Sequence, residues 1–368
     1  MPYQIKDSMR SQLSVIYEFV KILSYVYLFL FSIDLMGAGF KLSGSGFTTK
    51  MMQTTSNPFI GLIIGIVTTS IVQSSSLTTS IVVAMVGAGT LTLTNAVPII
   101  MGANIGTTVT NTIVSFGYLN RKGEFERAFG TGIVHDIFNI SATLILFPLE
   151  LYTGILSKSA LFLSSVFVGV GGFKIISPLV IIINPLVEII IKIIGNHIVI
   201  IIGSLILLFV ALGKIVKIMH GIVIHKVEGI LNKYFFRNNL VSFLVGLILT
   251  SIIQSSSITT SIIVPLVGAG ILTIEQIYPY TLGANVGTTV TAILAALTIG
   301  IEASMAIAFC HMLFNVYGIL IFYPLKFFPI WTAKTIARLV ARSKKNFFIF
   351  LALYITLHII PIILVFIH

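Results

Sequence analysis

Gln73-Ser74-Ser75-Ser76 recurs in this chain as Gln254-Ser255-Ser256-Ser257, each time inside a long apolar stretch. A second polar island follows each copy 29 residues later, at 102–108 and at 283–289. Aligned over 73–110 and 254–291, the two copies agree at 24 of 38 positions. Unpaired hydroxyls and amides cost several kcal/mol each in hydrocarbon. The duplicated polar runs therefore indicate that the chain uses them on something polar.

The composition predicts a polytopic membrane protein. The chain is 57% hydrophobic and 9% charged, with a mean hydropathy of +1.08, whereas soluble domains are about a quarter charged. The polar N-terminus and the length of the first apolar segment favour a retained span over a signal peptide. Segments of roughly the 20 residues needed to cross a bilayer occur near 16–36, 96–118, 128–149, 198–219, 277–297, 305–324 and 347–367.

The net charge of +11 does not point to nucleic acid. Lys and Arg cluster at the ends of the apolar segments, where the positive-inside rule places them, so the charges indicate topology signals and contacts with lipid headgroups. Cys310 is the single cysteine, and no metal-ligand spacing, nucleophile triad or nucleotide-binding motif is present. We therefore expect no enzymatic activity, no cofactor and no transition-metal site.

The duplication organises the chain into two units. Beyond the islands, His135 matches His311 and Asn139 matches Asn315. The predicted fold is an all-α polytopic membrane protein with two inverted-topology repeats, each with a re-entrant helical hairpin. Residues 1–150 form the first repeat, with its first span, a hairpin at 57–94 and spans at 96–118 and 128–149. The remaining parts are a connector at 151–197, a second repeat at 198–326 (span 198–219, hairpin 239–274, spans 277–297 and 305–324) and a basic amphipathic segment with a last span at 327–368.

The hairpins follow from a length argument. Each Gln-Ser-Ser-Ser run divides its apolar stretch into two arms of about 16 residues, or roughly 24 Å as helix, which is short of a hydrocarbon core of roughly 30 Å. Interrupted apolar segments at matching places in two halves are the best sequence pointer to a transporter's binding site.

The orientation follows from charge. If Lys6 and Arg10 are cytoplasmic, the hairpin at 57–94 opens to the outside and the hairpin at 239–274 to the cytoplasm. We expect a multi-pass protein of the plasma (inner) membrane with a cytoplasmic N-terminus. The apolar but interrupted residues 155–194 are interpreted as an external or interfacial segment.

The segments that contain the two islands carry almost no charged side chains. No charged side chain occurs between Met51 and Asn120, and only Glu275 between Asn238 and Ile301. Hydroxyls, amides and helix N-termini attract anions, and their oxygens also suit a hard cation such as Na⁺. Helix dipoles of about half a charge compensate a divalent anion poorly, so bound cations would complete the neutralisation. The alternative interpretation of such residues is helix packing and hydrogen bonding to the preceding turn.

These residues resemble the type II sodium–phosphate cotransporters and their bacterial relatives. The similarity covers nearly the whole chain and includes Ser56-Asn57-Pro58, Val72–Ser76, Gly102–Asn111, Val134–Asn139 and Cys310-His311. It implies Na⁺-driven phosphate uptake by alternation of inverted repeats. Phosphate would then lie among Ser74, Ser75, Ser76, Ser255, Ser256, Ser257, Asn104 and Asn285, and Na⁺ would be bound by Gln254, Ser255, Thr288 and Thr291, with a symmetry-related set of Gln73, Thr107 and Thr110.

The sequence thus predicts a transporter whose partners are inorganic phosphate, Na⁺ and the lipid bilayer. One alternative is coupling to H⁺, or transport of another oxyanion. Another, from a different class, is a passive anion channel or a membrane sensor. Assembly into a homo-oligomer is left open.

Overall fold

The computed structural model describes residues 2–170, 178–230, 236 and 238–358, and its elements in that part of the chain are all helices. The first half contains α1 (Pro2–Leu42), α2 (Gly44–Thr54), α3 (Pro58–Val72), α4 (Ser75–Gly87), α5 (Leu93–Gly106), α6 (Val109–Ser115), the 3₁₀ turn η1 (Phe116–Tyr118) and α7 (Lys122–Thr153). The second contains α8 (Ile155–Val170), α9 (Pro178–Ile194), α10 (His197–Ile230), α11 (Asn239–Ile253), α12 (Ser256–Ser261), α13 (Ile263–Gly268), α14 (Ile274–Ile299), α15 (Glu302–Phe322), α16 (Phe327–Arg342) and α17 (Lys344–His358).

Six segments of the described chain are long and apolar enough to cross a membrane, or seven if the α2–α3 pair, bent by 98°, forms one span. They agree in position with the first six predicted spans: Val20–Leu42, Leu93–Tyr118, Lys122–Thr153, His197–Ile215, Ile274–Ile299 and Glu302–Phe322. The chain is therefore an all-α, multi-pass membrane protein. The predicted last span, 347–367, is covered by α17 only as far as His358, because residues 359–368 lie outside the described part.

The first arm of each Gln-Ser-Ser-Ser segment packs tightly against the helix that carries the downstream island, α3 against α5 and α11 against α14. Glycines explain the close approach. A Cβ added at Gly102 would meet the carbonyl oxygen of Leu62, and one at Gly283 would meet that of Phe243. Small residues allow the backbones of two helices in lipid to touch in this way, and they lie at matching positions in the two units.

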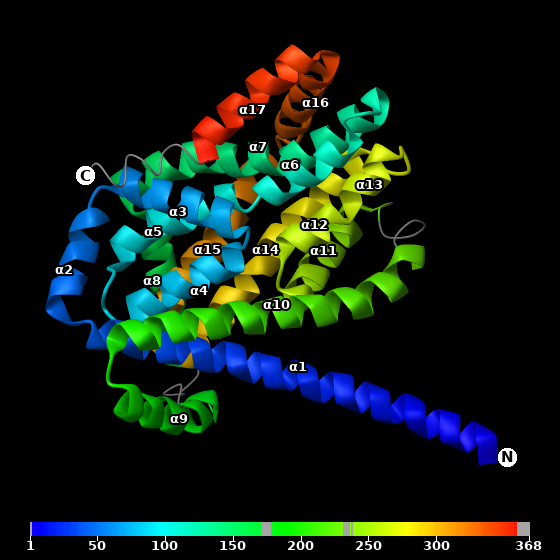
Figure 1. The fold of residues 1–368 in the computed structure, drawn as a ribbon. Coiled ribbons are helices and arrows are strands. Elements are labelled where there is room, and N and C mark those ends of the chain that lie inside the picture. Colours follow the sequence, from blue (N-terminus) through cyan, green and yellow to red (C-terminus); the bar gives the residue numbers. More distant parts are fainter. Residues whose placement is uncertain (1, 171–177, 231–235, 237, 359–368) are drawn as a thin grey trace.

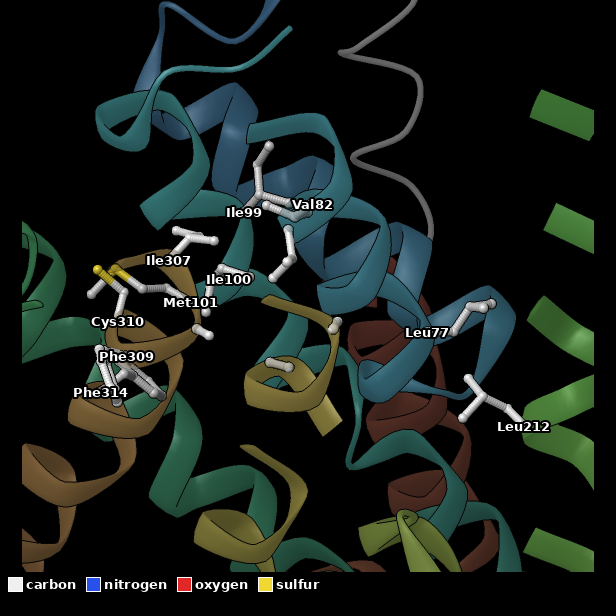
Figure 2. Packing of buried hydrophobic residues seen from close by; sticks show 14 of the residues in the cluster. Leu77, Val82, Ile99, Ile100, Met101, Leu212, Ile307, Phe309, Cys310 and Phe314 are labelled. Carbon is white, nitrogen blue, oxygen red and sulfur yellow. The ribbon is translucent and has the colours of Figure 1, made fainter. Parts of the chain in front are cut away.

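The second arms reach across to the other unit. Helix α4 packs on α14 and α15, whereas α12 and α13 pack on α6 and α7. Figure 2 shows Val82 of α4 beside Ile99 of α5, with Ile307 of α15 on the far side of α5. The two units therefore share one hydrophobic core.

The second arm of the second unit is divided into α12 and α13, unlike the continuous α4. The helix interruption falls at Ile262. Pro265 stands where the first unit has Ala84. Proline lacks the N–H that would bond to the preceding turn, and its ring crowds that turn.

The remaining helices surround this core. Helices α1 and α10 lie side by side along one flank (Figure 1), while α16 packs on α7 and α17 packs on α16. The described residues of the predicted connector lie largely in α8 and α9. Helix α8 packs on α15, and α9 packs on α1. The location of the connector relative to the membrane stays a prediction.

Candidate functional site

Both Gln-Ser-Ser-Ser runs break their helices with the same backbone geometry. Gln73 has φ 54° and ψ 29°, and Gln254 has φ 59° and ψ 26°. Among the described residues these are the two non-glycine positions with positive φ. The left-handed conformation costs a side chain roughly 1–2 kcal/mol and is typical of functional positions held by their surroundings.

The serine after each glutamine starts the next helix. The Ser74 hydroxyl accepts a hydrogen bond from the Leu77 N–H at 3.2 Å, and Ser255 caps α12 in the same way. A hydroxyl pair then bridges the two arms, Thr69 with Thr78 at 2.9 Å in the first unit and Thr250 with Thr259 at 2.7 Å in the second. Each break is thus a built feature rather than a frayed helix end.

A cavity of about 310 Å³ lies between the two breaks and α10. Its polar lining comes from both units: Gln73, Ser74, Thr110, Ser255 and Ser257. Its apolar walls include Leu77, Ile258 and Leu212, and Figure 2 shows Leu77 and Leu212 near each other across the space between α4 and α10. None of the described residues that line it is ionisable.

The breaks also contact each other directly. Ser76 donates a hydrogen bond to the Gln254 carbonyl at 2.9 Å, and Ser257 donates one to the Thr107 carbonyl at 3.3 Å. Thr107 in turn donates from its side chain to the Ser75 hydroxyl at 2.7 Å. Segments about 180 residues apart in the sequence therefore meet at one point.

The residues predicted to bind Na⁺ are buried to different extents. Gln254, Thr288 and Thr291 are buried, whereas Gln73 is exposed. The Thr288 hydroxyl bonds back to the Ala284 carbonyl at 3.0 Å. Buried oxygens without a hydrogen-bond partner in the described chain include Gln254 Oε1, Thr291 Oγ1 and Thr110 Oγ1. Such atoms are rare in native proteins, and a bound ion or water commonly supplies the missing partner.

Asn104 and Asn285 do not line the cavity but form a buried network with the matching histidines and asparagines. Asn285 Oδ1 lies 2.5 Å from His135 Nε2, and Asn104 Oδ1 lies 3.3 Å from His311 Nε2. Asn139 joins the two, since it accepts from Asn285 at 2.8 Å and donates to the Asn104 carbonyl at 2.7 Å. Each unit thus bonds crosswise to the other.

Two further polar residues of the first unit were not predicted as site residues, and neither has a polar counterpart in the second unit. Asn111, which matches Ala292, accepts from Thr260 at 3.0 Å and from Ser261 at 2.9 Å, and donates to Thr260 at 2.7 Å. Asp136, which matches Met312, accepts from the hydroxyls of Thr108, Thr112 and Tyr354.

The arrangement suits small polar ions better than covalent chemistry. Hydroxyls, amides and the amides at the start of α4 can hold an anion, and the unpartnered oxygens can hold a hard cation. No group of three or more His, Cys, Asp or Glu that could hold a metal ion occurs in the described residues.

Comparison with known proteins gives the family. The family model described as Na+/Pi-cotransporter matches residues 28–174 and 206–324. Sodium-dependent phosphate transport protein 2A of Rattus norvegicus is 34% identical over 403 residues, covering 88% of this chain and 63% of the relative. The 2B proteins of Pongo abelii and Homo sapiens are 32% and 31% identical, each covering 88% of this chain and 62% of the relative.

The chain thus spans about 63% of the length of the curated relatives it matches. No solved structure matches it. The family model covers most of the chain, including both Gln-Ser-Ser-Ser segments and both downstream islands. The chain therefore belongs to the Na+/Pi-cotransporter family.

Proposed function

We propose that this protein is a secondary active transporter that takes up inorganic phosphate together with Na⁺ by alternating access. The observation that carries the proposal is the cavity of about 310 Å³ lined by polar side chains from both breaks and by no ionisable group. The relatives, which are sodium-dependent phosphate transport proteins by name, are named for the same cation and the same anion.

Phosphate would occupy the cavity between Ser74–Ser76 and Ser255–Ser257. Ser74, Ser255 and Ser257 line it, and so does Leu77 in the first turn of α4. Because helix N-termini supply only about half a positive charge each, a phosphate there needs cations beside it. A role for Asn104 and Asn285 requires their network with His135 and His311 to rearrange.

Sodium would be the co-transported cation. One set is Gln254, Ser255, Thr288 and Thr291; the other is Gln73, Thr107 and Thr110. The unpartnered oxygens of Gln254, Thr291 and Thr110 support these assignments, because a cation would supply what each of them lacks.

The two units, 1–150 and 198–326, would have inverted topology in the plasma (inner) membrane, with a cytoplasmic N-terminus, re-entrant hairpins at 57–94 and 239–274, an external or interfacial connector at 151–197 and a last membrane segment within 327–368. The crosswise packing of α4 on α14 and of α12 on α6 supports this plan, because it is the arrangement that a pseudo-twofold axis between the units would generate.

Uptake by purified protein in proteoliposomes tests the function. With radiolabelled phosphate and an inward Na⁺ gradient, we expect accumulation above the external concentration; with K⁺ in place of Na⁺, we expect none. Na⁺-independent uptake, or uptake driven by a proton gradient alone, would contradict sodium coupling. Flux that only equilibrates phosphate would identify a channel, and inhibition by sulfate stronger than by unlabelled phosphate would identify another oxyanion as the substrate.

Cysteine labelling tests the inverted topology separately. Cys310 is buried and is the single cysteine, so Cys310→Ser gives a clean background. In sealed cells, a membrane-impermeant maleimide should label Thr94→Cys but not Ala269→Cys, two exposed positions near the ends of the hairpins. In inverted vesicles the pattern should reverse. Labelling of both from the same side would contradict the inverted arrangement.

A further inference from the structure

A second and larger hollow lies away from the candidate substrate site. This groove of about 550 Å³ is formed where the segment between η1 and α7 meets the corner between α16 and α17. Its lining includes Lys122, Arg342 and Lys344 together with Phe125, Phe347 and Phe348. We call it the basic groove. It brings together two stretches that are more than 200 residues apart in the sequence.

The charge in the basic groove is of one sign. None of the lining residues in the described part of the chain is Asp or Glu. The ion pairs in the described chain join other residues: Arg121 with Glu124, Lys334 with Glu275 and Arg338 with Glu126. Lys122, Arg342 and Lys344 thus have no carboxylate partner in that part of the chain, and they are exposed. Three unneutralised cations around one hollow favour an anion.

The wall of the basic groove is aromatic. Phe347 packs edge-on against Phe116 and Phe125, at ring-centroid distances of 5.3 and 6.2 Å. Phe348, by contrast, is 62% exposed, and exposed apolar side chains continue along α17 at Ile349 and Leu353. Basic side chains next to exposed apolar ones mark the level where lipid headgroups meet hydrocarbon.

Helix ends reinforce the field of these cations. Lys122 is the first residue of α7, a helix of 32 residues, and Lys344 is the first residue of α17. The N-terminal ends of two helices therefore border the same hollow as the three side chains, and helix N-termini attract anions.

We propose that the basic groove binds the headgroup of a negatively charged phospholipid. The lipid phosphate would contact Lys122, Arg342 and Lys344, and its acyl chains would run along Phe348 and the apolar face of α17. A soluble anion would use the three cations but not the exposed apolar surface, which is why a lipid fits the groove better. The occupied groove would fasten α16 and α17 to α7, the helix that carries His135 and Asp136.

Fluorescence quenching by brominated lipids tests this site. Trp331 is the single tryptophan, so the double variant Trp331→Phe, Phe348→Trp places one indole in the groove. In mixed bilayers, we expect brominated phosphatidylglycerol to bind next to this indole at least about fivefold more strongly than brominated phosphatidylcholine, since each basic residue near the surface contributes about 1 kcal/mol. Equal quenching by the two lipids would overturn the proposal.

A charge-neutral variant and its control locate the preference. Adding Lys122→Gln, Arg342→Gln and Lys344→Gln should reduce the ratio to about one. Neutralising three other exposed cations, Lys50, Lys158 and Lys192, should leave it unchanged. If the triple variant does not fold, Lys344→Gln alone should still lower the ratio. A ratio that survives neutralisation would overturn the site, and loss of the preference on addition of millimolar inorganic phosphate would show that the groove takes soluble phosphate instead of lipid.

Discussion

The two Gln-Ser-Ser-Ser breaks have the same backbone conformation but different surroundings. Gln73 and Gln254 both adopt the left-handed conformation, followed by a serine cap and a threonine bridge. Yet Gln73 is exposed at the cavity, whereas Gln254 is only 8% exposed and its carbonyl accepts a bond from Ser76. Local sequence therefore determines the break itself, and the packing of the whole chain determines which break faces open space.

The helices that follow the two breaks, α4 and α12, also differ in how they are held. Asn111 of the first unit holds α12 of the second unit through Thr260 and Ser261. The matching residue of the second unit is Ala292, whose methyl side chain can form no hydrogen bond to α4. An exposed first break opposite a buried second break, whose following helix is held by Asn111, is an asymmetry expected of one state in the proposed alternating-access cycle.

The largest expected effect is a loss of stability that is equal in the two units. Gly102→Ala and Gly283→Ala each force a Cβ against a facing carbonyl oxygen, so both should destabilise the protein by about 3 kcal/mol, at the upper end of overpacking costs. Thermal unfolding and gel filtration in detergent measure this. Gly203→Ala, with no atom near its added Cβ, serves as the control. If only one of the two variants is destabilised, the two packing interfaces are not equivalent.

The next largest expected effect is a loss of transport that differs between the two glutamines. Gln254→Ala should lower Na⁺-driven phosphate uptake about 100-fold, because removing a partner of a charged group costs roughly 1.5–3 kcal/mol. Gln73→Ala, at the exposed break, should lower it about tenfold. Initial rates in proteoliposomes over a range of Na⁺ concentrations give both values.

The control for that comparison separates side chain from backbone. Gln254→Gly relieves the positive φ and also removes the amide, so it should be more stable than Gln254→Ala while transporting no better. Equal losses at the two glutamines, or a larger loss at Gln73, would contradict the assigned asymmetry.

A smaller effect should follow from the polar docking of α12. Asn111→Ala removes three hydrogen bonds, so it should lower the stability of the docked arm by about 2 kcal/mol. Hydrogen exchange at the backbone amides of 256–261 should then become roughly thirtyfold faster. Ala292→Asn, the reverse change in the other unit, should leave exchange in α12 as it is. Unchanged exchange in Asn111→Ala would show that apolar packing alone holds α12.

The smallest effect concerns the central network. His135→Leu leaves Asn285 Oδ1 without its donor, whereas after His311→Leu Asn104 Oδ1 still lies 3.4 Å from Asn315 Nδ2. We therefore expect His135→Leu to be about 1 kcal/mol more destabilising than His311→Leu. Thermal melts of the two variants test this, and the opposite order would contradict the described hydrogen-bond pattern.

The duplication in the sequence made the two breaks and the helices that follow them predictable. Two copies of one polar pattern predicted two similar breaks and two matching downstream helices, and the structure has them. The partners of Asn111 and Asp136 were not predictable, because neither residue is duplicated and Tyr354 lies 218 positions from Asp136. The helices within 155–194 were missed because Lys174, Pro178 and Pro185 interrupt the apolar pattern there, although Pro178 stands at the first position of α9, where proline is favoured.

Accessibility of the cavity from the two sides of the membrane tests the central claim most directly. Leu77 and Ile258 both line the cavity at matching positions and are not assigned to an ion. In the Cys310→Ser background, we expect an impermeant thiol reagent to reach both Leu77→Cys and Ile258→Cys from either side of the membrane, because the shared cavity opens to each side in turn, with Na⁺ and phosphate together slowing all of these reactions. Modification of Leu77→Cys from one side only and of Ile258→Cys from the other side only, or no protection by Na⁺ and phosphate, would contradict a single site shared by two alternating breaks.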